Sequence, residues 1–413
     1  MDLIIFPTRL HGTITPPPSK SQAHRLIILA ALAKGKNTIE NFEPSEDLLA
    51  TIRAMRALGA QIEIDGQTLH IHGIDPHSAW TKELPRIDCG ESGSTLRFLI
   101  PVALAVAGGG VFTGSERLMQ RPLEPYFAIF RKQGIHYSLE NNTLTVQGKL
   151  QPGQYHLPGD VSSQFFSGLL FALPLLNEPS VLIPEGRLES SGYITMTLHA
   201  LSLFGIHIPA TMSIPPQYHI PAGSVYHPVS LSVEADWSQA AFWYAAAGIG
   251  NDITVSGMTN ESFQGDRAIL EYGAMLNATG DVSIDISDCP DLAPPLAVWG
   301  ALREGQLRLT NAARLRLKES DRLAAITATL SAIGADIRAD EDSLTICGKK
   351  TLAGGVTVDC HNDHRIAMML AIAATRCDQP ITLLGAQCVG KSYPRFWQDF
   401  TALGGIIREH IGE

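Results

Sequence analysis

The chain has 413 residues, more than a single hydrophobic core usually serves, so we expect two domains. Apolar residues make up 45% and charged residues 17%, as in a globular protein with a large core, and a net charge of −10 argues against a general nucleic-acid or membrane surface. The six cysteines form no CxxC pair, the N-terminus lacks a secretory pattern, and no apolar run reaches the ~20 residues that cross a bilayer. These features predict a cytoplasmic protein with reduced thiols.

A pattern of amphipathic helix, glycine and alternating strand recurs along the chain, first as TIRAMRALGAQIEI. A glycine just past a helix supplies the left-handed residue that ends it, so each glycine is expected to terminate a helix. The glycines are Gly59, Gly134, Gly205, Gly273, Gly334 and Gly404, at intervals of 61 to 75 residues. Their near-constant spacing indicates six repeats.

A second set of helices is apolar on nearly every side. They begin near Ser21, Ser94, Ser163, Trp237, Leu292 and His364. Helices of this kind must be buried. Short alternating segments such as QTLHIHG and NTLTVQG fill the gaps and are typical of strands. The sequence therefore predicts an α/β fold with about six βαβαββ units, in which the buried helices of one domain run parallel.

The starts of the buried helices carry most of the polar side chains in their segments. Capping alone accounts for serine and aspartate at these positions, but it explains poorly why lysine, arginine, glutamine and histidine gather there as well. Parallel helices with their N-termini on one face present free N–H groups and positive dipole ends, which bind anions. The pattern therefore predicts anionic small-molecule substrates.

The first half of the chain supplies the larger share of these candidates. In chain order they are Lys20, Ser21 and Arg25 in PPPSKSQAHR, Gly93 and Arg97 in DCGESGSTLR, Arg121 in GSERLMQRP, Ser162, Ser163 and Gln164 in DVSSQF, and Ser190 and Tyr193 in ESSGY. Lys–Ser at a helix start resembles the end of a phosphate-binding loop. The GxxxxGK pattern is absent, however, so a nucleotide P-loop is not expected.

The second half adds carboxylates beside the cations. They are Asp291 in DCPDLAPP, Lys318, Glu319 and Arg322 in RLRLKESDRL, Asp363, His364 and Arg365 in DCHNDHR, and Lys391 in CVGKSYPRF. Helix capping is the alternative for Asp291, and a solvated face with i,i+3 ion pairs is the alternative for RLRLKESDRL. The residues 359–364 could pass for a metal site, but no second cluster with ligand spacing occurs. A serine or cysteine nucleophile has no supporting motif either.

Seven blocks in order resemble the enolpyruvylshikimate-phosphate (EPSP) synthase family over essentially the whole chain: SKSQAHR, ESGSTLR, QRPLEP, DVSSQF, KESDR, NDHR and GKSYP. The resemblance implies transfer of the enolpyruvyl group of phosphoenolpyruvate (PEP) to the 5-hydroxyl of shikimate 3-phosphate, with loss of phosphate from a tetrahedral intermediate. This step lies on the route to chorismate and the aromatic amino acids. Neither metal nor cofactor is implied, and the absence of an obvious apolar patch makes a monomer the default expectation.

The same resemblance implies a two-domain, inside-out α/β barrel with three βαβαββ repeats in each domain. Residues 19–233 would form the domain on the shikimate 3-phosphate side. Residues 1–18 plus 234–413 would form the other domain, and the active site would occupy the cleft between them.

By matching position, the resemblance assigns roles to individual residues. Asp291 would take the proton of the 5-hydroxyl, Glu319 would protonate the methylene carbon of PEP, and Lys20 would complete the catalytic set. The PEP-binding set would be Lys20, Gly93, Arg121, Gln164, Arg322, Arg365 and Lys391. The shikimate 3-phosphate set would be Ser21, Arg25, Ser162, Ser163, Gln164, Ser190, Tyr193, Asp291 and Lys318. Supporting positions would be Asp47, Arg97, Asp363 and His364.

Three positions depart from the usual family pattern. Arg314 and Glu91 each stand where asparagine is frequent, and Phe98 follows Arg97 where some members have proline. These departures leave the shape of the PEP pocket open, and with it the sensitivity to the PEP mimic glyphosate, although retention of Gly93 favours sensitivity.

Two other functions are weighed. The sister enzymes that use UDP-N-acetylglucosamine generally carry a cysteine in the loop matching GSERLMQRP and lack the NDHR block, whereas this loop has no cysteine. A non-catalytic binder of phosphate ligands would have no use for two carboxylates facing a polyanion.

Overall fold

The computed structural model describes residues 1–410, and the chain forms two compact units. The middle unit is Pro18–Glu234, and the terminal unit is Met1–Pro17 together with the chain from Ala235 onward. The sequence analysis put the boundaries after residues 18 and 233, so each observed division lies one residue away. None of the helices within residues 1–410 has the length and apolar composition needed to cross a lipid bilayer.

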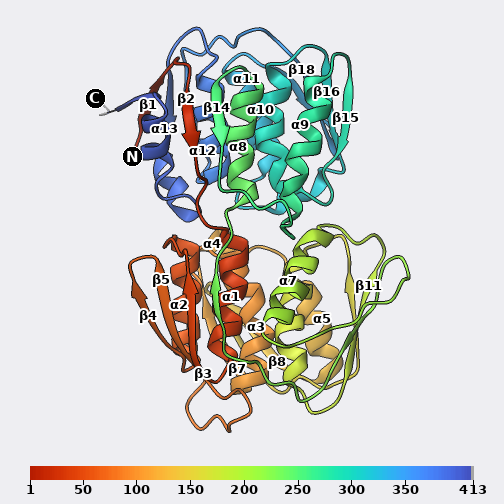
Figure 1. Ribbon diagram of the computed structural model, residues 1–413. Helices are drawn as coiled ribbons and strands as arrows, with labels where there is room; N and C mark the ends of the chain where they lie inside the picture. Colours follow the sequence, from red (N-terminus) through yellow and green to blue (C-terminus); the bar gives the residue numbers. More distant parts are fainter. Residues whose placement is uncertain (411–413) are drawn as a thin grey trace. The chain divides into compact units, whose positions relative to one another are not determined.

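The middle unit holds its helices in the interior, with strands toward its outside (Figure 1). Its helices are α1 (Lys20–Leu32), α2 (Glu46–Ala57), α3 (Gly93–Ala107), α4 (Glu116–Met119), α5 (Glu124–Gln133), α6 (Ser163–Ala172) and α7 (Ser191–Leu203), with a 3-10 turn η1 (Leu173–Leu175). Its strands are β3 (Gly35–Glu40), β4 (Gln61–Asp65), β5 (Thr68–Gly73), β6 (Arg86–Asp88), β7 (Gly109–Thr113), β8 (His136–Glu140), β9 (Thr143–Gln147), β10 (Gln154–Pro158), β11 (Ser180–Glu185), β12 (Tyr218–Ile220) and β13 (Ser230–Ser232).

One strand pattern recurs in the three sheets of this unit. Their orders are β13-β3-β5-β4, β6-β7-β9-β8 and β10-β11-β12. In each sheet the first two strands pair in parallel and every later pair is antiparallel. The shared topology is what the repeated sequence pattern builds.

The terminal unit has the same design. Its helices are α8 (Trp237–Gly248), α9 (Ile269–Asn277), α10 (Ala293–Ala301), α11 (Arg322–Ala332), α12 (His364–Ala374) and α13 (Phe396–Ala402), with 3-10 turns η2 (Gly265–Ala268), η3 (Pro290–Leu292), η4 (Ala313–Leu317) and η5 (Ala386–Lys391). Its strands are β1 (Leu3–Phe6), β2 (His11–Ile14), β14 (Asp252–Val255), β15 (Val282–Asp285), β16 (Gln306–Thr310), β17 (Asp336–Ala339), β18 (Ser343–Cys347), β19 (Thr357–Asp359), β20 (Ile381–Leu384) and β21 (Ile406–Glu409). The sheets are β15-β16-β18-β17, β19-β20-β1-β21 and the pair β14-β2.

The apolar helices form the core of each unit, as the sequence predicts. Helix α12 buries every residue from His364 to Ala374, and α1 buries every residue from Gln22 to Leu32. Fully burying one leucine or isoleucine side chain stabilises a fold by about 1.5–3 kcal/mol, so these helices contribute much of the hydrophobic stabilisation. Because their sides and C-terminal turns are buried, polar chemistry on them is concentrated in the first turns.

The repeat glycines behave as expected at five of six positions. The five that follow helices have positive φ, with values from +69° at Gly134 to +103° at Gly59. The prediction for Gly273 was wrong, because this glycine lies inside α9. A Cβ there would sit 2.7 Å from Cη2 of Trp299, so the missing side chain makes room for an indole ring.

The strand expected directly after Gly205 is also absent, since residues 206–209 form no strand. Pro209, Pro215 and Pro216 interrupt this segment, and proline cannot donate to a sheet ladder. The sheet is completed by β12 instead, which pairs with β11.

Candidate active site

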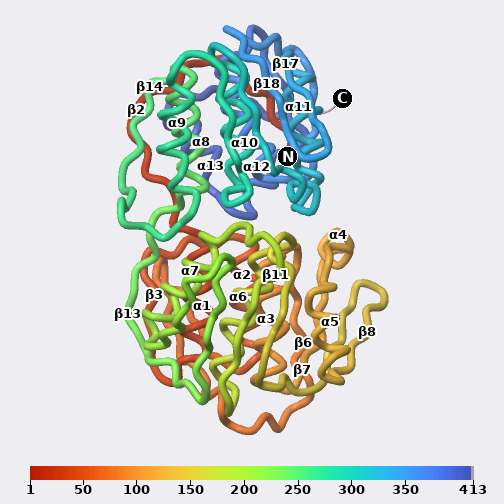
Figure 2. The backbone as a smooth tube through the Cα atoms, turned by 90° about the vertical axis from the view of Figure 1, so that its right-hand side faces the viewer, coloured from red at the N-terminus to blue at the C-terminus, as the bar shows by residue number. Residues whose placement is uncertain are grey.

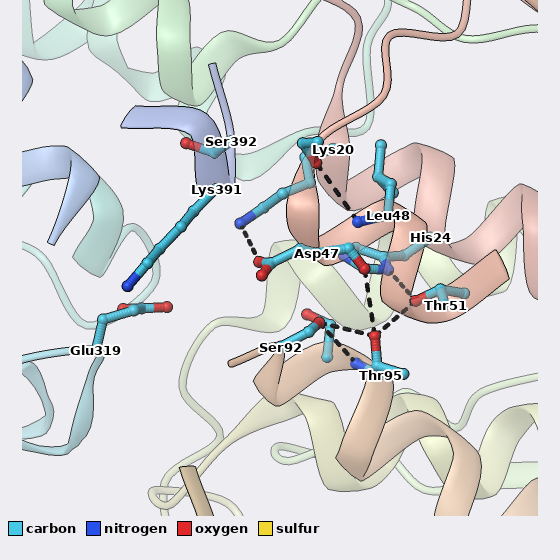
Figure 3. A network of polar contacts seen from close by, with 12 residues as sticks. Lys20, His24, Asp47, Leu48, Thr51, Ser92, Thr95, Glu319, Lys391 and Ser392 are labelled. Carbon is cyan, nitrogen blue, oxygen red and sulfur yellow. Dashed lines mark hydrogen bonds and ion pairs between the residues drawn. The ribbon is translucent and has the colours of Figure 1, made fainter. Parts of the chain in front are cut away.

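The starts of α1 and α2 meet through an ion pair. Lys20 is the first residue of α1 and Asp47 the second of α2, and Nζ of Lys20 lies 2.9 Å from Oδ2 of Asp47. Figure 3 shows the two side chains pointing toward one another. Both are mostly buried, with 14% of each side chain exposed, so the pair is shielded from bulk water.

A chain of buried side-chain hydrogen bonds continues from α1 into α2 and α3. Nδ1 of His24 lies 2.8 Å from Oγ1 of Thr51, which lies 2.7 Å from Oγ1 of Thr95. Thr95 donates to Oγ of Ser92, the N-cap residue of α3, at 2.8 Å (Figure 3). Burial, Lys20 and Arg25 hold the pKa of His24 well below its usual value, so the imidazole stays neutral. These bonds tie three helix starts together.

The starts of α3 and α6 are joined by Arg97 and Gln164. Nη1 of Arg97 donates to Oε1 of Gln164 at 2.8 Å, and Nε2 of Gln164 donates to Oγ of Ser94 at 3.0 Å. The guanidinium of Arg121 covers Gly93 so closely that a Cβ there would lie 2.6 Å from Nη1. Within residues 1–410, the buried Nε of Arg121 has no hydrogen-bond partner, which leaves a cationic donor for an anion.

Arg25 connects α1 with α7. It donates to the carbonyl oxygens of Ser21 at 2.6 Å and Tyr193 at 3.0 Å, and to Oγ1 of Thr197 at 2.8 Å. Burial lowers the pKa of Arg25 to about 10, so it remains a cation at neutral pH. The same guanidinium lies 5.2 Å above the ring of Phe98, one of the positions that departs from the family pattern. Three of the hydrogen bonds that Arg25 donates therefore hold the starts of α1 and α7 together.

The remaining predicted residues of the middle unit also lie at helix starts. Ser162 is the N-cap of α6 and accepts from the amide of Gln164 at 3.3 Å, and the buried Ser163 follows it. Ser190 precedes α7 with a positive φ of 55°, an uncommon conformation for serine that costs backbone strain.

In the terminal unit, one arginine is the centre of the site. The side chain of Arg322 is 1% exposed, and its guanidinium contacts three carboxylates. The distances are 2.9 Å from Nε to Oδ2 of Asp363, 2.9 Å from Nη1 to Oδ1 of Asp291, and 2.6 Å from Nη2 to Oε2 of Glu319. Burial acts to lower the pKa of Arg322, but Asp363, Glu319 and Asp291 outweigh it and raise the pKa above its usual value.

Asp291 is paired with two further cations. Nη2 of Arg365 lies 3.0 Å from its Oδ2, and Nζ of Lys318 lies 3.4 Å from its Oδ1. Burial lowers the pKa of Lys318 to about 8, although Asp291 opposes that shift. Since the carboxylate of Asp291 faces three cations, helix capping does not account for this residue. The solvated-face alternative for RLRLKESDRL is likewise wrong at Arg322, which is buried.

The rest of the terminal-unit set surrounds the start of α12. Asp363 is its N-cap and accepts from the amide of Arg365 at 3.0 Å, and His364 is its buried first residue. Nζ of Lys391 donates to the carbonyl of Asn362 at 2.7 Å, and its side chain points toward Glu319 in Figure 3. Within residues 1–410, no three histidine, cysteine, aspartate or glutamate side chains are grouped to hold a metal ion.

Sequence reasoning missed several polar residues that support these groups. Thr51, Thr95 and His24 carry the buried network in the middle unit, and Ser320 donates to Oδ2 of Asp363 at 3.0 Å in the terminal unit. Asp266 is buried beside Ser238, and burial followed by the charge of Asp291 raises its pKa to about 6. A polar residue on the buried side of an apolar helix is the one signal that could have indicated Thr51 and Thr95.

Comparison with known proteins decides which family has this arrangement. A family model described as EPSP synthase (3-phosphoshikimate 1-carboxyvinyltransferase) matches residues 5–400. The chain belongs to the EPSP synthase family. The 3-phosphoshikimate 1-carboxyvinyltransferase of Clostridium perfringens strain 13 is 44% identical, covering 98% of this chain and 99% of that protein. The enzyme of the same name from Clostridioides difficile strain 630 is 43% identical, with 98% of each chain covered.

Solved structures agree with this membership. EPSP synthase from Acinetobacter baumannii superposes with a TM-score of 0.81 at 27% identity, covering 99% of this chain and 100% of that one. The enolpyruvyl transferase NikO from Streptomyces tendae has a TM-score of 0.74 at 17% identity, with 98% of each chain covered, and shows likeness of fold. The fold is therefore the two-domain enolpyruvyl transferase fold. The chain is a transferase of the 1-carboxyvinyl group in the shikimate pathway.

The contact between Arg322 and Asp363 can be tested with two matched helix caps. Asp363→Asn keeps an N-cap acceptor but removes a fully buried counter-charge from Arg322, so it should lower the free energy of unfolding by about 3 kcal/mol. Asp321→Asn is the control, because Asp321 caps α11 and pairs with Arg316 at an exposed position. It should cost less than about 1 kcal/mol. Urea denaturation measures both, and equal losses would contradict the account.

Proposed function

We propose that Asp291 and Glu319 carry out the proton transfers when the enolpyruvyl group of PEP moves to the 5-hydroxyl of shikimate 3-phosphate. Asp291 removes the hydroxyl proton, and Glu319 protonates the methylene carbon of PEP. The observation that supports this proposal is the shared contact with Arg322, which lies 2.9 Å from Asp291 and 2.6 Å from Glu319. One buried cation thus holds both carboxylates beside each other.

The reaction requires both an acid and a base. PEP is an enol phosphate with an electron-rich double bond, so nucleophilic attack at C2 needs a proton delivered to C3. The attacking hydroxyl must lose its proton in the same step. In the tetrahedral intermediate the former C3 is a methyl group; when it returns a proton to a carboxylate, the C2–O bond to phosphate breaks and the departing phosphate oxygen takes up the other proton. Negative charge on the carboxylate and both phosphates is stabilised by fixed cations, which explains why arginines and lysines outnumber the two functional carboxylates.

The cations around Asp291 have a second consequence. While Arg322, Arg365 and Lys318 all face its carboxylate, Asp291 is engaged in three ion pairs. The carboxylate and phosphate of PEP compete for Arg322 and Arg365. Binding of PEP therefore weakens these ion pairs and leaves the carboxylate of Asp291 available to the hydroxyl proton.

The middle unit supplies the remaining binding groups in this proposal. Lys20, Gly93 and Arg121 bind PEP, and the buried Nε of Arg121 that lacks a protein partner is suited to an anionic oxygen. Gln164 contacts both substrates. Shikimate 3-phosphate is bound by Ser162, Ser163 and the other hydroxyl-bearing and cationic residues of its predicted set, which are Ser21, Arg25, Ser190, Tyr193 and Lys318. We further propose that residues of both units act on one pair of substrates, and that the protein works as a cytoplasmic monomer that binds no nucleic acid.

The catalytic role of Glu319 is tested with a matched substitution. Glu319→Gln removes the acidic proton but retains the size of the side chain, so kcat should fall by about 10²–10⁴-fold while PEP binding weakens only modestly. Glu341→Gln, at an exposed turn position of the same unit, should leave kcat unchanged. Phosphate release measures turnover and fluorescence titration measures binding. A Glu319→Gln enzyme within twofold of wild type would overturn the assignment.

The low pKa of Lys318 predicts a pH dependence. A cation whose pKa falls from 10.5 to about 8 loses its charge in the folded protein as the pH rises through 8. The free enzyme should then bind the phosphate of its substrate less well, so kcat/KM for shikimate 3-phosphate should decline above about pH 8. Lys318→Arg keeps its charge throughout this range and should move the decline to higher pH. An identical alkaline limb in both enzymes would show that Lys318 is not the titrating group.

A further inference from the structure

Helix α3 lacks one of its ordinary backbone hydrogen bonds. Pro101 lies inside the helix and has no N–H group. The carbonyl of Arg97, four residues earlier, therefore lacks its ordinary intrahelical donor. An unpaired buried carbonyl costs free energy, so a donor from elsewhere is expected.

The missing donor comes from Tyr126 of α5. Its hydroxyl donates to the carbonyl of Arg97 at 2.7 Å and also lies 3.2 Å from the carbonyl of Phe165 in α6. The Tyr126 side chain is fully buried, and its ring packs edge-on against the ring of Phe165 at 4.8 Å between centroids. Burial raises the pKa of Tyr126 well above its usual value, so the hydroxyl keeps its proton. One phenol thus bridges two helices.

A glycine allows the two helices to approach at this level. A Cβ on Gly168 of α6 would lie 2.3 Å from Oη of Tyr126 and 2.5 Å from the carbonyl oxygen of Arg97. It would also lie 3.0 Å from the ring of Pro101. Figure 2 shows α3 and α6 side by side, and their Cα atoms are in extensive contact. Pro101, Tyr126 and Gly168 therefore form one packed joint, which we call the α3–α6 joint.

The α3–α6 joint is directly bonded to residues that hold the side chains assigned to substrate binding. The residue whose carbonyl Tyr126 binds is Arg97, and its guanidinium holds Gln164 at 2.8 Å. Gln164 directly precedes Phe165, whose carbonyl is the second acceptor. The Arg97 guanidinium also lies 5.0 Å from the Phe165 ring and donates to the carbonyl of Pro122, next to Arg121. Any shift at the joint would move Arg97 relative to Gln164.

We propose that Tyr126 is a positioning residue for PEP, whose hydroxyl fixes Arg97 and Gln164 relative to each other by replacing the backbone donor that Pro101 removes. This inference rests on the proposed assignment of Gln164, Gly93 and Arg121 to PEP. Tyr126 itself touches no substrate in this account. Its effect is transmitted through the backbone of α3.

The first test compares two tyrosines with the same local chemistry. Tyr226 is also buried, and its hydroxyl donates to the carbonyl of Phe171 at 2.7 Å, near the opposite end of α6. Tyr126→Phe should lower kcat/KM for PEP about tenfold, mainly by raising KM for PEP, since one buried hydrogen bond is lost. Tyr226→Phe should lose similar thermal stability and keep kcat/KM for PEP within twofold of wild type.

The second test restores the missing donor. Pro101→Ala returns an N–H group four residues after Arg97, so the double variant Tyr126→Phe/Pro101→Ala should recover most of the tenfold loss in kcat/KM for PEP. Such recovery would show that the hydroxyl of Tyr126 acts by supplying this donor, and the Tyr226→Phe control separates that action from a general loss of stability. Three results would each overturn the inference: an unaltered KM for PEP in Tyr126→Phe, an equal change in Tyr226→Phe, or no recovery in the double variant.

Failure of this inference is distinguishable from failure of the proposed function. A wild-type protein that releases no phosphate from PEP and shikimate 3-phosphate would contradict the proposed function. If wild type is active and Arg97→Gln leaves KM for PEP unchanged, the assignment of this part of the pocket is wrong. If wild type is active and Arg97→Gln raises KM for PEP but Tyr126→Phe does not, only the proposed role of Tyr126 is contradicted.

Discussion

The burial of whole helices is the constraint on which the rest of this structure depends. Helices α1 and α12 are covered along almost their entire length, so a charged side chain has few places where its solvation can be replaced. The first turn is such a place, because polar capping residues and acidic side chains gather there and can pair with a buried cation, even though the positive end of the helix dipole by itself disfavours one. Lys20, Arg97, Arg322 and Arg365 all occupy the first two turns of their helices. The packing of the core therefore decides where chemistry can occur.

Burial also demands that each of these charges be compensated. Arg322 shows how this is done, with Asp363 as a fully buried counter-charge and Asp291 and Glu319 as partly accessible ones. The first partner also caps α12 and so has a structural task, whereas the other two remain partly exposed to solvent. Lys20 is likewise compensated, by a single ion pair with Asp47. The site is held together by the same ion pairs that substrates would rearrange.

Much of the fold could be predicted from the sequence because the repeat is visible in the regular spacing of glycines and of apolar residues. The glycine after a helix is a local requirement, and five of the six positions followed it. The prediction for Gly273 was wrong because glycine is needed there for tertiary packing, namely to make room for the Trp299 ring. The strand predicted after Gly205 does not form, because the prolines in that segment prevent an otherwise suitable alternating pattern from pairing in a sheet. Local signals thus located the elements, and long-range packing decided the exceptions.

Candidate site residues could be found from motif blocks at helix starts, but their supporting partners could not. His24 bonds to Thr51 across 27 positions of sequence, and Tyr126 bonds to Arg97 across 29. No spacing rule predicts such pairs, since they depend on which helices lie side by side. The defect at Pro101 was visible in the sequence as a proline within an apolar helix, yet only the structure identifies the donor that repairs it.

The central claim is that this site moves an enolpyruvyl group from PEP to shikimate 3-phosphate. The most direct measurement is release of inorganic phosphate from purified protein given PEP with shikimate 3-phosphate, and in parallel with UDP-N-acetylglucosamine as the acceptor. The account predicts release with shikimate 3-phosphate alone. Release with only the sugar nucleotide, or no release with either acceptor despite tight binding, would contradict it.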